Sequence, residues 1–302
     1  GLSMKLQGKL FSLITVFTLT FIVNVANSHD GHKSEDIILK DLGNLGKVNF
    51  AISCDTETQK AFNIGVGLLH HMMYAQAEQL FQKSIEQQPN CAMLYWGYTM
   101  SLFHPLWPDR ITEEALTKGQ LALTTAQKTH KTQREKAYIT TAEKYYKDWK
   151  ETSEKARIKA WANAHTKLYK DYPNDIDATA FYALSQLVVA SKKDKTFSTN
   201  KKVGEILSTI IDTHPLHPGA IHYSIHAYDN PKHAKLGLKS ARAYDKIAPD
   251  VPHALHMPTH VFVRLGEWQD AINWNSRSAI AALKYPTKGA TSMHYVHALD
   301  YK

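Results

Sequence analysis

Histidines with the spacing of metal ligands are concentrated toward the C-terminal end of the sequence, in the stretches 217–226, 253–260 and 294–297. Each stretch contains a pair of histidines three or four positions apart. On a helix, this spacing places both imidazoles on one face, one turn apart. The pairs are His222 and His226, His256 and His260, and His294 and His297.

Neutral imidazoles are good ligands for transition metals, and two of them on adjacent turns of a helix form half of a coordination site. A set of six imidazoles with few carboxylates favours copper or zinc, and the affinity order of divalent metals favours copper. The sequence therefore predicts that these six histidines bind copper or zinc, in a metal-binding protein or a metal-dependent enzyme.

Two other interpretations fit the same histidines. Each one can be a hydrogen-bonded core residue, or the set can line a groove that binds an acidic peptide or a phosphate group. The sequence contains no Gly-rich phosphate loop, no His-Glu-x-x-His motif and no zinc-finger cysteine spacing. It also offers no obvious catalytic base or nucleophile, so the catalytic residues are unknown and the question of enzyme activity stays open at this point.

The segments that carry the pairs have the register of a helical repeat. Counted from Thr58, residues of the expected kinds fall where a tetratricopeptide repeat of about 34 residues places them, at Gly65, Ala77, Phe81, Ser84 and Pro89. Small residues let the two helices of a unit pack closely, and the proline ends the second helix. We expect an all-α, right-handed solenoid of antiparallel helix pairs over residues 58–302, truncated at its C-terminus, with weaker matches in its middle units.

The same register predicts where the histidines point. In a stacked tetratricopeptide array, the first helix of each unit faces the concave side. Units counted from Pro218, Pro252 and Ala290 place the three histidine pairs on such helices. The pairs are therefore expected to share one hollow, which is also where a protein or peptide partner would bind. Pro258 lies inside one of these helices and should kink it.

The first 28 residues have the order of a secretory signal peptide. Gly1–Ser3 lie upstream of the expected initiator, Met4, Lys5 and Lys9 form a basic start, Leu10–Val25 is mostly apolar, and Ala26–Ser28 fits a cleavage site. A membrane anchor is the alternative, although the apolar run is shorter than the ~20 residues of a spanning helix. We therefore expect a periplasmic or secreted protein without a membrane span, beginning near His29 with a polar, disordered leader over residues 29–57.

Cysteine content and charge narrow the function further. Cys54 and Cys91 are the only cysteines, and an even count in an oxidising compartment favours a disulfide over two free buried thiols. The formal net charge is +8, with acidic and basic residues well mixed along the chain. Because a nucleic-acid-binding protein gathers its basic residues on one element, we expect no nucleic-acid partner.

Two clusters of motifs resemble one protein family. The first is Cys91-Ala-Met93-Leu-Tyr-Trp96-Gly97, followed by Ser101-Leu-Phe-His104-Pro-Leu-Trp107. The second joins His217-Pro-Gly-Ala220 and His222-Tyr223 to His256-Met-Pro258 and His260. Together they resemble a family of exported bacterial tetratricopeptide repeat proteins, over most of residues 53–302. The resemblance implies the solenoid fold and export, and it implies no particular activity.

Overall fold

The computed structural model describes residues 42–285 and 292–300, which contain helices and no β-strand. This confirms the all-α prediction for the described residues. The predicted signal peptide at 1–28, leader residues 29–41 and the start of the last predicted helix near Gly289 lie outside these ranges. None of the helices within them has the length and apolarity needed to cross a membrane.

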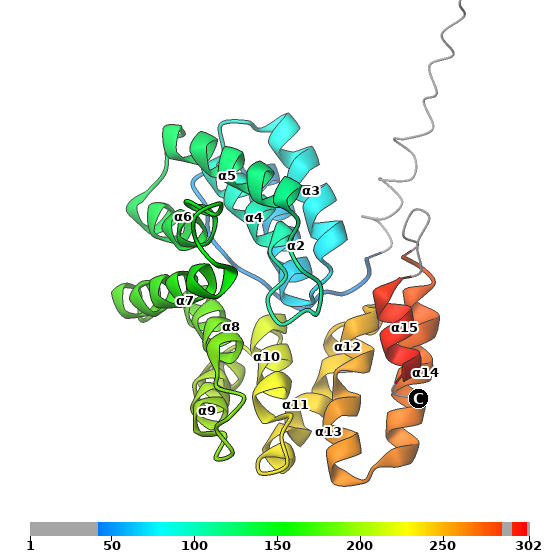
Figure 1. Cartoon of the computed structure of the whole chain (residues 1–302). Coiled ribbons are helices and arrows are strands. Elements are labelled where there is room, and N and C mark those ends of the chain that lie inside the picture. The colour runs from blue at the N-terminus through cyan, green and yellow to red at the C-terminus, as the bar shows by residue number, and fades with distance from the viewer. Residues whose placement is uncertain (1–41, 286–291, 301–302) are drawn as a thin grey trace, which may run out of the picture.

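The helices follow one another with short connections (Figure 1). Their bounds are α2 (Thr56–His70), α3 (Tyr74–Gln87), α4 (Ala92–Leu102), α5 (Glu113–Lys128), α6 (Gln133–Tyr146), α7 (Glu154–Asp171), α8 (Ile176–Val189), α9 (Ser198–Thr213), α10 (Pro218–Tyr228), α11 (Ala234–Ile247), α12 (Pro252–His256), α13 (Pro258–Leu265), α14 (Trp268–Ala282) and α15 (Met293–Asp300). Met257 separates α12 from α13 directly before Pro258, which is the predicted interruption.

Neighbouring helices pack in chain order, and several alternate helices also touch. The alternate contacts join α2 to α4, α4 to α6, α8 to α10, α11 to α13 and α12 to α14, and contacts three places apart join α10 to α13 and α12 to α15. One further contact joins α2 to α10, which are far apart in the sequence (Figure 1). The array of helices therefore curls until its first described helix touches the helix that carries the first histidine pair.

The helices at the centre of this array are buried on all sides. Every residue of α4 is buried, and in α10 only His226 is not fully buried. By contrast, α11 buries one face, with positions such as Gly237, Ala241 and Tyr244 recurring at helical spacing. A helix that is apolar all round must be enclosed, whereas an amphipathic helix covers a core and faces solvent on its other side.

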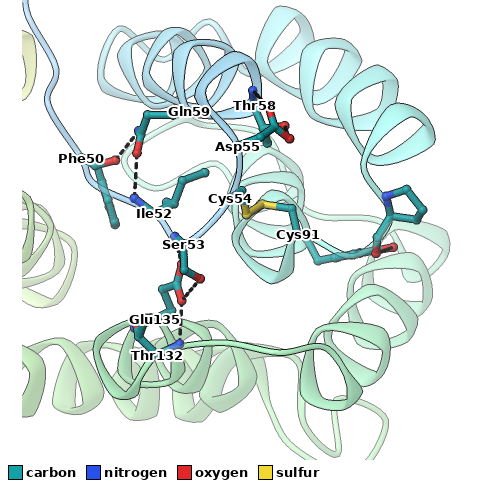
Figure 2. Close-up of a disulfide and its surroundings, with 12 residues drawn as sticks. Phe50, Ile52, Ser53, Cys54, Asp55, Thr58, Gln59, Cys91, Thr132 and Glu135 are labelled. Atoms are coloured by element: carbon teal, nitrogen blue, oxygen red, sulfur yellow. Dashed lines mark hydrogen bonds between the residues drawn. A yellow bond between two sulfur atoms is a disulfide. The ribbon is translucent and has the colours of Figure 1, made fainter.

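An extended segment, Leu42–Cys54, precedes α2, and we call it the N-terminal strap. Its Phe50 is fully buried, with its ring centroid 5.1 Å from that of Phe62 and 4.6 Å from that of Tyr138. Figure 2 shows the polar contacts beside it, where the Ser53 backbone N–H donates to Glu135 at 2.7 Å. This part of the predicted leader is therefore packed against the helices, because one aromatic side chain and its neighbours anchor it.

The other end of the strap lies against α10 and α2. The backbone N–H of Lys47 donates to the carbonyl of Leu216 at 2.8 Å, immediately before α10 begins. Gly46 has a φ of 80°, a left-handed conformation that glycine adopts without strain. A Cβ at Gly46 would also overlap the Leu216 carbonyl oxygen. The strap thus bridges segments that are distant in the sequence.

The strap is also covalently fixed. Cys54 at its end forms a disulfide with Cys91, the residue that precedes α4, as drawn in Figure 2. This is the pairing that the cysteine count favoured. Closing a loop with a sequence separation of 37 residues stabilises the folded chain by about 3–4 kcal/mol in the chain-entropy account.

Some histidines outside the three pairs are buried and uncharged. The ring of His71 bonds to the Tyr244 hydroxyl and to the Leu45 carbonyl, each at 2.9 Å. Burial lowers the pKa of His71 to about 4, although the Leu45 carbonyl opposes this effect. His165 has no hydrogen-bond partner among the described residues, and burial lowers its pKa to about 3. Both rings therefore stay neutral in the folded protein well below pH 6.5, the usual histidine value.

We expect the free energy of unfolding to have its full value above pH 6.5 and to fall as the pH drops below it, because the folded chain keeps these two histidines unprotonated. The unfolded chain binds a proton at each histidine near pH 6.5, whereas the folded chain does so only near pH 3 to 4. The free energy of unfolding should decrease by about 2 kcal/mol per histidine between pH 6.5 and pH 5, and urea titrations measure it. His165→Leu should flatten the decrease, and an unchanged slope in that variant would contradict the assignment.

Candidate metal centre

Four neighbouring helices carry the predicted histidines. His222 and His226 lie on α10, His256 ends α12, His260 lies on α13, and α15 carries the last pair. The break before Pro258 does not separate His256 from His260, because their Nε2 atoms lie 2.9 Å apart. The carbonyl of His256 accepts a hydrogen bond from the Thr259 hydroxyl at 2.7 Å across this break.

The first histidine group consists of His222, His226 and His253, whose ligand nitrogens all lie within 4.8 Å of one another. Nδ1 of His222 donates to the carbonyl of His70 at 2.5 Å, so its Nε2 carries a lone pair. That lone pair faces Nε2 of His226 at 3.1 Å. His253 is only 2% exposed, and neither of its ring nitrogens has a hydrogen-bond partner among the described residues.

The second histidine group consists of His256, His260 and His297, again with ligand nitrogens within 4.8 Å of one another. Nδ1 of His256 donates to the side-chain oxygen of Asn275 at 2.7 Å. Nδ1 of His260 donates to the carboxylate of Asp229 at 2.8 Å. When both rings are neutral, these bonds leave a lone pair on each Nε2 atom, and the two lone pairs face each other, an arrangement that a cation between them stabilises.

Burial keeps four of the imidazoles in these groups in the neutral form that binds metals. Burial lowers the pKa of His256 well below its usual value, and the neighbouring His260 and His297 lower it further. Burial likewise lowers the pKa of His226 to about 3, and it holds those of His222 and His253 well below the usual value. Neutral imidazoles present ligand lone pairs at physiological pH without first losing a proton.

Asp229, which follows α10, orients the second group. Burial by itself raises the pKa of Asp229. The hydrogen bonds and charges of His260 and Arg264 lower it by more than burial raises it, so the pKa lies well below its usual value. Nε of Arg264 donates to Asp229 at 3.0 Å. An ionised carboxylate behind a histidine fixes the ring tautomer and makes the other nitrogen a better ligand.

The structure thus divides the six predicted residues. Five of them fall into the two groups, and His253 completes the first group. His294 belongs to neither group, but its ring centroid lies 5.6 Å from that of His253, and its buried Nδ1 has no partner among the described residues. Trp107 lies beside both, with its ring centroid 5.1 Å from each of theirs. His253 has a signal in the sequence, three positions before His256, whereas the roles of Asp229 and Trp107 have none.

A cavity of about 660 Å³ opens beside both groups. Its wall includes His226 and His253 from the first group and His260 and His297 from the second. Apolar side chains such as Trp107, Phe197 and Met257 form much of the remaining wall. A concave, mostly apolar space with a few convergent polar groups is the usual form of a small-molecule site.

A third cluster, formed by His70, Asp177 and His217, has the spacing of a metal site but a different chemistry. Both histidines place Nε2 3.3 Å from the Asp177 carboxylate. Nδ1 of His70 bonds to the Tyr223 hydroxyl at 2.9 Å, and Nδ1 of His217 accepts the Ala220 backbone N–H at 3.1 Å. Every ring nitrogen of this cluster is already paired, so it needs no metal.

A cavity of about 870 Å³ lies beside this third cluster and the strap. It is larger than the cavity at the histidine groups, and two of its charged groups pair with each other, since Arg134 donates to Asp175 at 2.6 Å. Comparison with known proteins adds no further residues, because neither a family model nor a curated protein matches the chain. The functional conclusion therefore rests on the two histidine groups.

We expect Asp177→Asn to destabilise the protein without changing its metal content. Both rings bond the same carboxylate oxygen, and the neutral amide oxygen that replaces it is a weaker acceptor, so two buried hydrogen bonds are weakened at a cost of about 1–3 kcal/mol. Urea unfolding gives the change in stability, and elemental analysis of the folded variant gives its metal content. Loss of metal from folded Asp177→Asn protein would mean that the third cluster belongs to the metal site.

Proposed function

We propose that this chain is an exported tetratricopeptide repeat protein that binds a transition metal, copper or zinc, through its histidine groups. The proposed ligands are His222, His226, His253, His256, His260 and His297, with His294 beside them. Imidazole-only sites suit these two metals. The adjoining cavity supports a metal-dependent reaction on a small molecule as the purpose of the site.

The facing nitrogens of His256 and His260 carry the proposal. Their Nδ1 atoms are held as donors by Asn275 and Asp229, so when both rings are neutral no proton lies between the two Nε2 atoms. Two lone pairs at 2.9 Å repel each other. A bound metal ion turns this repulsion into two coordination bonds, which is the physical reason to expect one there.

The packing of the first helices supports the repeat assignment. Phe81 of α3 lies against Gly65 of α2 and Gly97 of α4, where a Cβ on either glycine would overlap its ring. Gly65 and Phe81 are two of the positions from which the register was derived. The right-handed superhelix and the membership of the exported family are part of the same proposal.

Two observations support export to the periplasm or the exterior. The disulfide between Cys54 and Cys91 suits an oxidising compartment. The signal-like order of the first 28 residues supplies the route.

We expect the untagged, chelator-stripped protein to rebind copper or zinc tightly. The double substitution His256→Ala with His260→Ala should weaken that binding more than ~100-fold, which exceeds the effect of removing a residue that only hydrogen-bonds a metal ligand. Metal content after dialysis and competition with a chromogenic chelator measure both. His214→Ala, which removes an exposed imidazole elsewhere, is the control and should retain full affinity. Less than ~0.5 metal ions per chain in the unaltered protein would contradict the proposal and leave a peptide-binding scaffold as the function.

We expect Asp229→Asn to reduce metal affinity by about 10- to 100-fold, because the amide no longer fixes the His260 ring with a charged acceptor. The same chelator competition measures it. Asp245→Asn is the matched control, since Asp245 also pairs with an arginine, Arg277, and belongs to neither histidine group. Equal effects of the two substitutions would show that Asp229 acts on the fold and not on the metal.

A further inference from the structure

We infer that the two histidine groups hold two metal ions side by side, as one dinuclear centre that binds a small bridging ligand, such as hydroxide, azide or dioxygen, in the adjoining cavity. This inference rests on the proposed function, and it adds the number of ions, their separate ligand sets and the class of ligand between them.

One short helix, α12, carries a histidine of each group. His253 and His256 lie three positions apart on α12, and their ring centroids are 6.0 Å apart. His253 belongs to the first group and His256 to the second. Ions bound by these two groups are therefore held by adjacent side chains of one helical turn, and neither can move away from the other.

Each group has the number of ligands that is typical of a reactive metal site. Three protein ligands with one open position are typical of catalytic zinc centres, whereas structural zinc sites have four ligands. Each group provides three imidazoles and no carboxylate. In the second group, the outer nitrogens of His256 and His260 are already occupied by Asn275 and Asp229, which leaves Nε2 as the ligand atom on both rings.

His253 is the residue whose position favours two metal ions over one. The pair of His222 and His226 can satisfy itself, because Nε2–H of His226 can donate to the lone pair of His222 at 3.1 Å. His253 lies beside them with both ring nitrogens unpartnered among the described residues, although it is 2% exposed. These nitrogens are available as ligand atoms, and His253, unlike His165, has one of them within 4.8 Å of the ligand nitrogens of two other histidines. A second metal ion pairs it and makes the first group complete.

Both groups face one cavity. His226 and His253 line it from the first group, and His260 and His297 line it from the second. Trp107 covers the junction between the groups, since its ring centroid lies 5.1 Å from that of His253 and 6.2 Å from that of His297. A small ligand in the cavity therefore has access to both ions at once, next to an apolar wall that limits water.

Copper titration of the untagged, chelator-stripped full chain tests the inference. We expect two copper ions per chain, with an electron paramagnetic resonance signal that accounts for less spin than the copper present, because two adjacent Cu(II) ions couple magnetically. Azide should then give a charge-transfer band that saturates at one azide per two copper ions.

Variants that remove one ligand from each group show which group holds which ion. His253→Leu should leave one copper ion, with its full spin intensity and an unchanged set of second-group ligands. His297→Leu should likewise weaken binding of the ion in the second group. His165→Leu is the matched control, because His165 is also buried with both nitrogens unpartnered but lies in neither group. It should retain two coupled ions.

The outcomes separate this inference from the proposed function. One copper ion per chain in the unaltered protein, insensitive to His253→Leu, overturns the dinuclear centre and leaves the metal-binding function in place. Two ions with full, uncoupled spin intensity also overturn it, since they would be independent sites. No bound copper or zinc at all overturns both. These measurements on the unaltered protein stand even where a variant fails to fold, which circular dichroism detects.

Discussion

The hydrogen bond from His222 to the carbonyl of His70 joins the beginning of the helical array to the helix that carries the first histidine group. It lies at the contact between α2 and α10, where the array curls back on itself. At the same contact, Tyr223 bonds to the ring of His70 at 2.9 Å. Because α10 is enclosed on all sides, its histidines keep the orientation that this contact gives them, and the candidate metal site depends on the closure of the fold.

Hydrogen-bond satisfaction separates structural histidines from candidate ligands. His70, His71 and His217 are buried, and each ring nitrogen has a partner with the right donor or acceptor character. His253 is equally buried and has none among the described residues. Spacing alone would treat all of them alike, whereas the pairing of each nitrogen, together with the nearness of other imidazoles, separates the completed clusters from the candidate ligands.

The N-terminal strap and the Trp107 loop have related effects on this site. The strap, held by Phe50 and the disulfide, ties the segment before α10 to the first helices. The loop between α4 and α5 brings Trp107 over the rings of His253 and His294. Neither segment is helical, yet both restrict how the histidine-bearing helices can move. Rigid support of this kind keeps ligand atoms at fixed separations.

The sequence by itself determined the features that arise within one turn or one helix pair. The spacing of His256 and His260, the interruption before Pro258 and the small residues around Phe81 are local, so helical periodicity and proline chemistry were sufficient to predict them. Tertiary structure alone decided which turns meet. The division of the histidines into two groups and the contact of Asp229 with His260 depend on the curl of the array. That curl is the sum of many small packing angles between helices, and no short stretch of residues encodes it.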